Sequence, residues 1–207
     1  MSERIALIDY GAGNLHSVHN ALKAAGAKDV CVTADPGDVH GADRVVLPGV
    51  GAFGACAGAL RAIPDMVDAL EDAVLSKGTP FLGICVGMQL MADSGIEFGR
   101  PRRAGLGISG TLRCAITSSP SIKIPHMGWN SVEPCKAHGI LEVGEAYFLH
   151  GFQYDVADPH RILATTDHGG EIVAAVERDN MIGVQFHPEK SQRYGIEFLT
   201  RFLAWRH

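Results

Sequence analysis

The sequence predicts an α/β protein with an open, doubly wound sheet whose strands are mostly parallel. Short apolar segments typical of buried strands lie at residues 4–9, 30–33, 44–49 and 80–84. Stripes of apolar residues at helical spacing, 15–25 and 64–76, lie between them, and Asn14 is suited to cap the first helix. Strand alternating with helix favours a parallel sheet.

The second half of the chain has a different pattern. From about residue 106 the helical spacing gives way to short strand-like segments separated by Gly, Pro and Asp turns, among them TLRCAI, SIKI, NSVEP, AYFLH, RILATT, EIVAAVE and MIGVQF. We expect these segments to add antiparallel strands to the sheet. A last helix is expected over residues 192–205 because Ile196, Leu199 and Leu203 share one apolar face. No repeat or linker divides the sequence, so we expect one domain over residues 1–207.

Composition narrows the class of protein. The 207 residues are 46% hydrophobic and 20% charged, with a formal net charge of -5, so no broad basic surface is available to bind nucleic acid or anionic lipid. No apolar run is long enough to span a bilayer, and the N-terminal residues have no basic region followed by an apolar one. The sequence therefore favours a cytoplasmic protein that acts on small molecules.

Metal and nucleotide cofactors are not expected. The five cysteines are widely spaced and none lies in a CxxC motif, which argues against disulfides and zinc. The ten histidines include no HExxH motif. YGAGN follows a strand but lacks the third glycine of a dinucleotide-binding loop, since His16 stands in its place. We predict free thiols and no cofactor.

Cys85 is the candidate nucleophile. It lies between a strand pattern and a helical one and is flanked by Gly83 and Gly87, as in the strained turn that exposes a nucleophile above a sheet. Glycines are needed there because the tight turn leaves no room for side chains. The start of a helix would also favour the thiolate. The alternative is a structural cysteine in a glycine-rich turn.

A cysteine nucleophile needs a base, and the base needs an orienting group. His187 ends the strand MIGVQF, because Pro188 lacks an N–H, and Glu189 follows close enough to bind the imidazole. His150 is the rival base, although no carboxylate lies within three residues of it. We expect His187 to be the base and Glu189 to fix its tautomer.

Acyl transfer also needs donors for an oxyanion. Gly49 and Gly51 would let the peptide at Val50 turn its N–H toward the site, and the N–H of Val86 is the natural second donor. The alternative is that residues 47–54 are a flexible connector.

Together these segments resemble the class I (triad) glutamine amidotransferases, over nearly the whole chain. GICVGMQ and QFHPEKS are similar to the class motifs. DYGAGN, LPGVGAF, PHMGWN and YFLHGF resemble those of one subfamily, the glutaminase subunits of imidazole glycerol phosphate synthase, in histidine biosynthesis. Val86, where leucine is usual, and Gly151, where Ser or Thr is more familiar, depart from the pattern. The resemblance implies a three-layer α/β/α, flavodoxin-like open twisted sheet.

The resemblance also implies a reaction. Cys85 would attack the carboxamide of L-glutamine, His187 would protonate the leaving ammonia and then activate water, and Glu189 would orient His187. Gln89 and Glu97 match positions that hold the glutamine substrate.

A partner is implied in the same way. Family members form a heterodimer with a (β/α)8 cyclase subunit, which receives the ammonia and makes imidazole glycerol phosphate and an aminoimidazole ribonucleotide. The partner-facing residues would include Asn14, Trp129, Asn130 and Lys190, although Trp129 suits a core position equally well. Two alternatives stay open: a glutaminase serving another synthase, and a redox-sensing flavodoxin-like protein.

Overall fold

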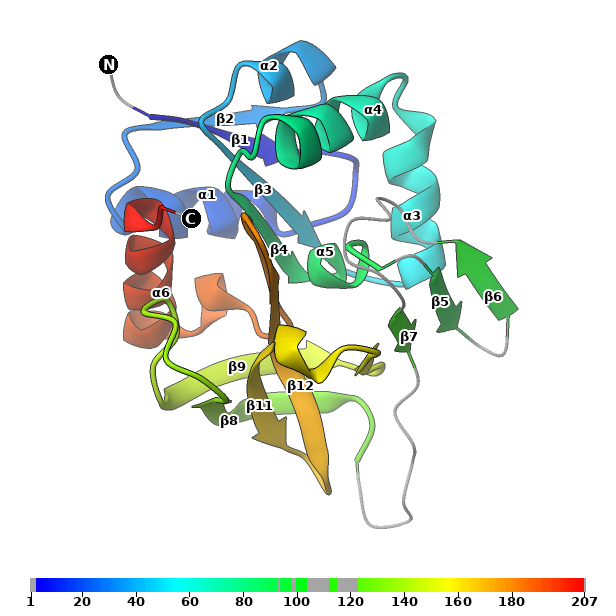
Figure 1. The fold of residues 1–207 in the computed structure, drawn as a ribbon, viewed down its shortest axis with the longest axis vertical. Coiled ribbons are helices and arrows are strands. Elements are labelled where there is room, and N and C mark those ends of the chain that lie inside the picture. Colours follow the sequence, from blue (N-terminus) through cyan, green and yellow to red (C-terminus); the bar gives the residue numbers. More distant parts are fainter. Residues whose placement is uncertain (1–2, 93, 98–99, 104–111, 115–122, 207) are drawn as a thin grey trace.

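The computed structural model describes residues 3–92, 94–97, 100–103, 112–114 and 123–206. Its main sheet has nine strands (Figure 1). In spatial order these are β2 (Asp29–Thr33), β1 (Arg4–Ile8), β3 (Arg44–Gly49), β4 (Phe81–Cys85), β13 (Met181–Val184), β12 (Glu171–Arg178), β11 (Ile162–Asp167), β8 (His126–Pro134) and β9 (Gly144–His150).

The sheet has a parallel half and an antiparallel half. The pairs from β2 through β13 are parallel, whereas β13 with β12, β12 with β11, β11 with β8 and β8 with β9 are antiparallel. The parallel strands β3, β4 and β13 are entirely buried, as expected of strands covered on both faces. The expected α/β fold with added antiparallel strands is confirmed.

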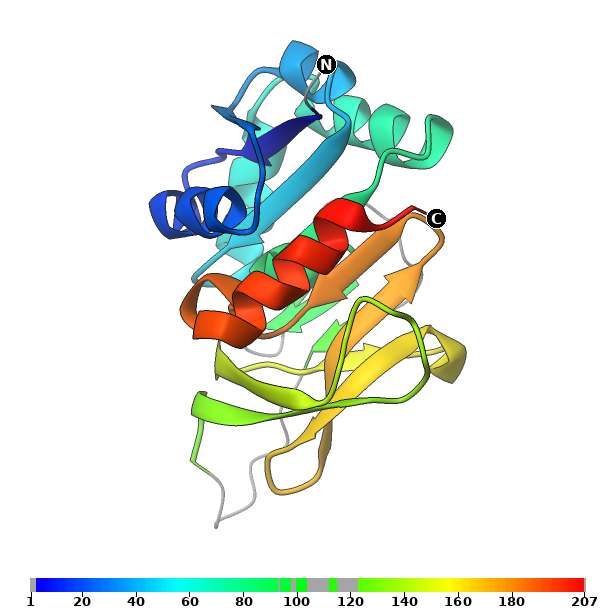
Figure 2. The ribbon, with the colours of Figure 1, turned by 90° about the vertical axis from the view of Figure 1, so that its left-hand side faces the viewer.

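Helices cover both faces of the parallel half. The helices are α1 (Leu15–Ala24), α2 (Pro36–His40), α3 (Phe53–Ala62), α4 (Met66–Glu71), α5 (Val86–Gln89) and α6 (Gln192–Ala204), with a π-helical turn at Asp72–Ser76 and 3₁₀ turns at Pro159–Arg161 and Pro188–Lys190. Helices α1 and α6 pack together on one face, whereas α3, α4 and α5 lie on the other (Figures 1 and 2).

Two small antiparallel sheets flank the main one. β5 (Ser94–Glu97) pairs with β6 (Arg100–Arg103), and β7 (Leu112–Cys114) pairs with β10 (Tyr154–Val156). The segment TLRCAI was expected to contain a strand, and β7 confirms its described part. Ser121 and Ile122 of SIKI lie outside the described residues, and Lys123 and Ile124 do not belong to a strand.

The structure differs from the sequence-based expectations in local detail. Helix α3 was not expected, because its Gly- and Ala-rich sequence does not separate clearly into an apolar and a polar face. Phe53, Cys56 and Leu60 are nevertheless buried on one side of it. The hairpin of β5 and β6 was also not expected. Asn14 is the N-cap residue of α1 as predicted, but its side chain makes no capping hydrogen bond.

Candidate active site

Three parallel strands bring the candidate residues to one edge of the sheet. Gly49, at the end of β3, pairs with Cys85, at the end of β4. On the other side of β4, Val184 of β13 pairs with Ile84, so the chain that continues to His187 leaves the sheet beside Cys85. Carboxyl ends of adjacent parallel strands are where open α/β sheets place their sites.

The turn at Cys85 has the strained geometry expected of a nucleophile turn. Cys85 has φ 54° and ψ -110°, a conformation that costs a non-glycine residue about 1–3 kcal/mol. A Cβ on Gly87 would lie 1.8 Å from the carbonyl oxygen of Leu47, and one on Gly83 would lie 2.7 Å from that of Gly87. Both flanking glycines are therefore required by close backbone contacts. Helix α5 after the turn is only four residues long, so its dipole is weaker than the sequence suggested.

His187 and Glu189 form a buried hydrogen-bonded pair. Glu189 Oε1 lies 2.8 Å from His187 Nδ1, and the two side chains are 2% and 1% exposed. The imidazole also hydrogen-bonds the Cys85 side chain, and Nδ1 is already engaged, so Nε2 faces the sulfur. The 3₁₀ turn Pro188–Lys190 brings the carboxylate back beside the ring. The structure thus brings Cys85, His187 and Glu189 together in the order that a nucleophile, base and orienting group require.

The pKa of His187 reflects these neighbours. Burial lowers the pKa, but hydrogen bonds and charge interactions with Cys85 and Glu189 raise it by a larger amount, so that the pKa is about 9. The imidazole therefore carries a proton at neutral pH, which suits a thiolate–imidazolium pair with Cys85.

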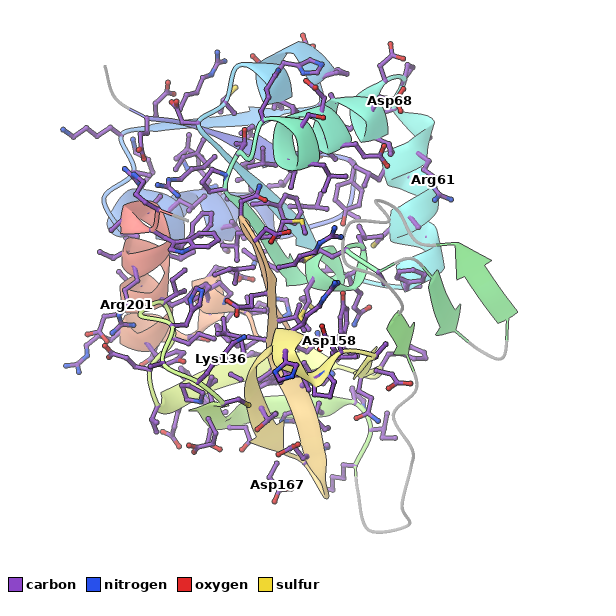
Figure 3. All side chains as sticks on the ribbon, in the orientation of Figure 1. Arg61, Asp68, Lys136, Asp158, Asp167 and Arg201 are labelled. Atoms are coloured by element: carbon purple, nitrogen blue, oxygen red, sulfur yellow. The ribbon has the colours of Figure 1, made fainter. Side chains whose placement is uncertain are left out.

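His150 belongs to a different network. Its Nδ1 donates to the carbonyl of Phe152 at 2.9 Å, so its Nε2 accepts from His126 Nδ1 at 3.0 Å. His126 Nε2 accepts in turn from the side-chain amide of Asn130 at 3.1 Å, and that amide also donates to the carbonyl of Asp167, at the end of β11 (Figure 3). Both ring nitrogens of His150 are thus occupied by partners other than Cys85, so the geometry does not support it as the base.

A cavity of about 100 Å³ opens above the turn. Cys85, His187 and the expected substrate residue Gln89 line it, together with His150 and Phe152. The expected oxyanion residues Val50, Gly51 and Val86 also line it, and Gly49 lies beside Cys85 in the strand register. Glu97 ends β5, but its side chain lies outside the described residues.

The segment after β3 is held at two carbonyl groups. The hydroxyl of Tyr10 donates to the carbonyl of Pro48 at 2.8 Å, and the thiol of Cys56 donates to the carbonyl of Val50 at 3.3 Å. A Cβ on Gly49 would lie 2.7 Å from the Tyr10 hydroxyl, so this position also requires glycine. The segment is therefore not a loose connector.

Two of the four expected partner-facing residues, Trp129 and Lys190, adjoin one surface, whereas the Asn130 side chain faces His126 on the other side of β8. Trp129 is 47% exposed, and its ring meets that of Tyr147 edge-on at 6.2 Å. The ammonium of Lys190 lies 5.9 Å from the same tyrosine ring. Asn130 follows Trp129 on β8 and is half-buried. Asn14 precedes α1, which packs against the 3₁₀ turn of Lys190. Trp129 is not a core residue.

Residues outside the expected set also support the site. Ser191 donates to the carbonyl of His187 at 2.6 Å and accepts from the backbone N–H of Tyr147 at 2.9 Å, which fixes the histidine against β9. Gln185 reaches Cys85 with its side chain. Gln185 lies two residues before His187 in the sequence, which suggests that both side chains face the same way, but no local pattern indicates that Gln185 reaches Cys85.

Two features are absent from the part of the chain that the structure describes. There, no group of three or more His, Cys, Asp or Glu side chains is placed to hold a metal ion. No helix within those residues is long and apolar enough to cross a membrane.

The fold is that of the class I glutamine amidotransferases. The family model "Glutamine amidotransferase class-I" matches residues 6–204, and the chain belongs to this family. It is 60% identical over 208 residues to "Imidazole glycerol phosphate synthase subunit HisH" of Zymomonas mobilis, with 99% of this chain and 97% of that protein covered.

Other relatives extend the comparison. The protein of the same name from Rhodospirillum rubrum is 48% identical over 213 residues, covering 98% of this chain and 99% of that protein. Among solved structures, "Structure of PurLQS from Thermotoga maritima" superposes with a TM-score of 0.72 at 19% identity and covers 99% of each chain. At that identity the likeness shows the fold alone.

Proposed function

We propose that this chain is the glutaminase subunit of imidazole glycerol phosphate synthase, which hydrolyses L-glutamine and passes the ammonia to a cyclase subunit in histidine biosynthesis. The observation that carries the chemistry is the buried contact of Cys85, His187 and Glu189 at the lip of a cavity. The relatives that share 60% and 48% of its residues over nearly their full length support the choice of synthase.

The reaction follows from the positions of these side chains. The Cys85 thiolate attacks the carboxamide carbon of glutamine, and the imidazolium of His187 gives its proton to the leaving ammonia. Neutral His187 then takes a proton from water as the water attacks the thioester carbon, which releases glutamate and restores the thiolate. Glu189 holds Nδ1, so only Nε2 faces the reacting atoms. We expect Gln89 to hold the substrate, a role supported by its position in the lining of the cavity.

The oxyanion formed in each step is stabilised by the backbone N–H groups of Val50 and Val86. Tyr10 anchors the peptide plane before Gly49, and Cys56 anchors the plane after Val50. The Gly49–Val50 peptide between these anchors is the one that turns, because glycine tolerates the change of backbone angles. We expect partner binding to select the turned state, which keeps hydrolysis low in the isolated chain.

The cyclase is expected to bind the surface formed by Trp129, Tyr147 and Lys190, with Asn14 nearby and the side chain of Asn130 behind it, on the opposite face of β8. An exposed tryptophan next to a tyrosine and a cation is typical of interface centres. Ammonia that escaped to water would be protonated and lost as a nucleophile, so a sealed interface serves the reaction.

The substitution Cys85→Ala tests the function. With the cyclase present, we expect glutamine-dependent synthesis to be lost while synthesis from added ammonia stays at the wild-type rate. The matched control is Cys135→Ala, at an exposed thiol, which should change neither activity. If Cys85→Ala removed both activities, Cys85 would be a structural residue. If wild-type chain with the cyclase produced no glutamate from glutamine, the proposed function would be wrong.

A further inference from the structure

Gln185 is a fully buried polar residue that the reaction described above does not use. It follows β13 and is 0% exposed. Its backbone N–H donates to the carbonyl of Ala174 at 2.8 Å, which fixes the main chain. A carboxamide that is removed from water costs free energy unless its own donors and acceptor find partners. The partners of this side chain therefore indicate why glutamine stands here.

The side chain connects the nucleophile to the substrate residue. Gln185 Oε1 accepts from Gln89 Nε2 at 3.1 Å, and Gln185 Nε2 donates to Cys85 Sγ at 3.6 Å. The bond from Gln89 sets the orientation of the carboxamide, because it holds the oxygen on the side away from the sulfur. Gln185 therefore presents an N–H group, and not a carbonyl, to Cys85.

A donor at this position favours one charge state of the sulfur. The carbonyl of Leu149, 3.8 Å from Cys85 Sγ, accepts a hydrogen bond from a neutral thiol and would repel a thiolate. The N–H of Gln185 acts in the opposite direction, since a hydrogen bond given to a charged acceptor stabilises that charge. Gln185 is 0% exposed and Cys85 only 3%, so the side of the sulfur that faces Gln185 is not open to solvent.

We propose that Gln185 is a further catalytic residue of the proposed glutamine hydrolysis, whose side-chain N–H stabilises the Cys85 thiolate. The bond acts twice in each turnover. It holds the thiolate before Sγ forms the C–S bond and ammonia leaves with the proton of His187. It then stabilises the charge on Sγ, which takes the electron pair of the C–S bond when water adds to the thioester and that bond breaks. The inference rests on the proposed function, but its test does not require glutamine or the cyclase.

The test is the pH dependence of Cys85 alkylation by iodoacetamide, measured on the Cys85 peptide by mass spectrometry in the full-length chain. Gln185→Met keeps the volume and removes the donor. Gln185→Glu keeps the shape and places a carboxylate beside the sulfur. Loss of one hydrogen bond to a charged group should move the midpoint up by about one pH unit, which is about tenfold slower alkylation below it. Gln185→Glu should move it further.

The matched control is Gln192→Met, at an exposed glutamine, which should leave the midpoint unchanged. The glutaminase activity of Gln185→Glu with the cyclase should fall in kcat more than KM rises, and the deficit should shrink as pH increases. A Gln185→Glu chain with wild-type thermal unfolding and an unshifted alkylation midpoint would overturn the role of Gln185. Because wild-type glutaminase activity is measured separately, that result would leave the proposed function intact.

Discussion

Two neighbouring hydrogen-bond networks in this molecule contain buried histidines of opposite charge state: protonated in one network and neutral in the other. In one, His187 lies between a carboxylate and a thiol, and its pKa is raised to about 9. In the other, His150 and His126 hydrogen-bond to each other, and their remaining ring nitrogens hydrogen-bond to an amide and a carbonyl. The pKa of His126 is lowered to about 4, mainly by burial and then by neighbouring histidines. The pKa of His150 is also lowered to about 4, and burial is again the largest cause.

The comparison teaches that burial alone does not set the charge of a histidine. Both networks are removed from water, and burial lowers the pKa in each of them. The difference is a single carboxylate and a thiol, which attract the proton of His187. In the second network the hydrogen bonds run in one direction, from Asn130 through His126 and His150 to the carbonyl of Phe152, and a second proton on either ring would place two N–H groups face to face.

The largest expected effect comes from removing the carboxylate that distinguishes the networks. Glu189→Gln should lower kcat/KM for glutamine by about 10²- to 10⁴-fold with the cyclase bound, since the orienting carboxylate then no longer stabilises the imidazolium. The pKa of His187 should fall toward its ordinary value. Steady-state glutaminase assays across pH measure both changes. Glu171→Gln, at an exposed residue, is the control, and equal activity of the two variants would contradict the role of Glu189.

A smaller effect is expected in the second network. His150→Gln should lower kcat/KM by less than about tenfold, because His150 is not the base, whereas His187→Gln should lose at least about 10²-fold. Parallel assays with the cyclase bound give the two ratios. A loss at His150→Gln as large as that at His187→Gln would contradict the assignment of His187 as the base.

The sequence predicted the fold because strand and helix patterns in the first half are strong and regular. Cys85 was found through Gly83 and Gly87, which flank it in the sequence, although the contact that requires Gly87 is with Leu47 of the adjacent strand β3. His187 was found through Pro188, which was expected to end its strand; β13 in fact ends earlier, at Val184. These features are local in the chain, so they can be inferred from neighbouring residues.

The residues that were missed act across long stretches of chain. Tyr10 contacts the carbonyl of Pro48, and Gln185 contacts Cys85, 100 residues away. Their roles depend on strand order, which periodicity does not give. The network of His126 and His150 joins residues of two adjacent antiparallel strands, β8 and β9, and its consequence for charge depends on which ring nitrogen each neighbour occupies.

The most direct test of the account is a ¹⁵N NMR titration of the imidazole rings in the full-length chain, with assignments from single histidine variants. At pH 7.5 His187 should be protonated on both nitrogens, because its pKa of about 9 lies above that pH. His150, with a pKa of about 4, should be neutral with its proton on Nδ1. A neutral His187 together with a protonated His150 at pH 7.5 would contradict the assignment of the base.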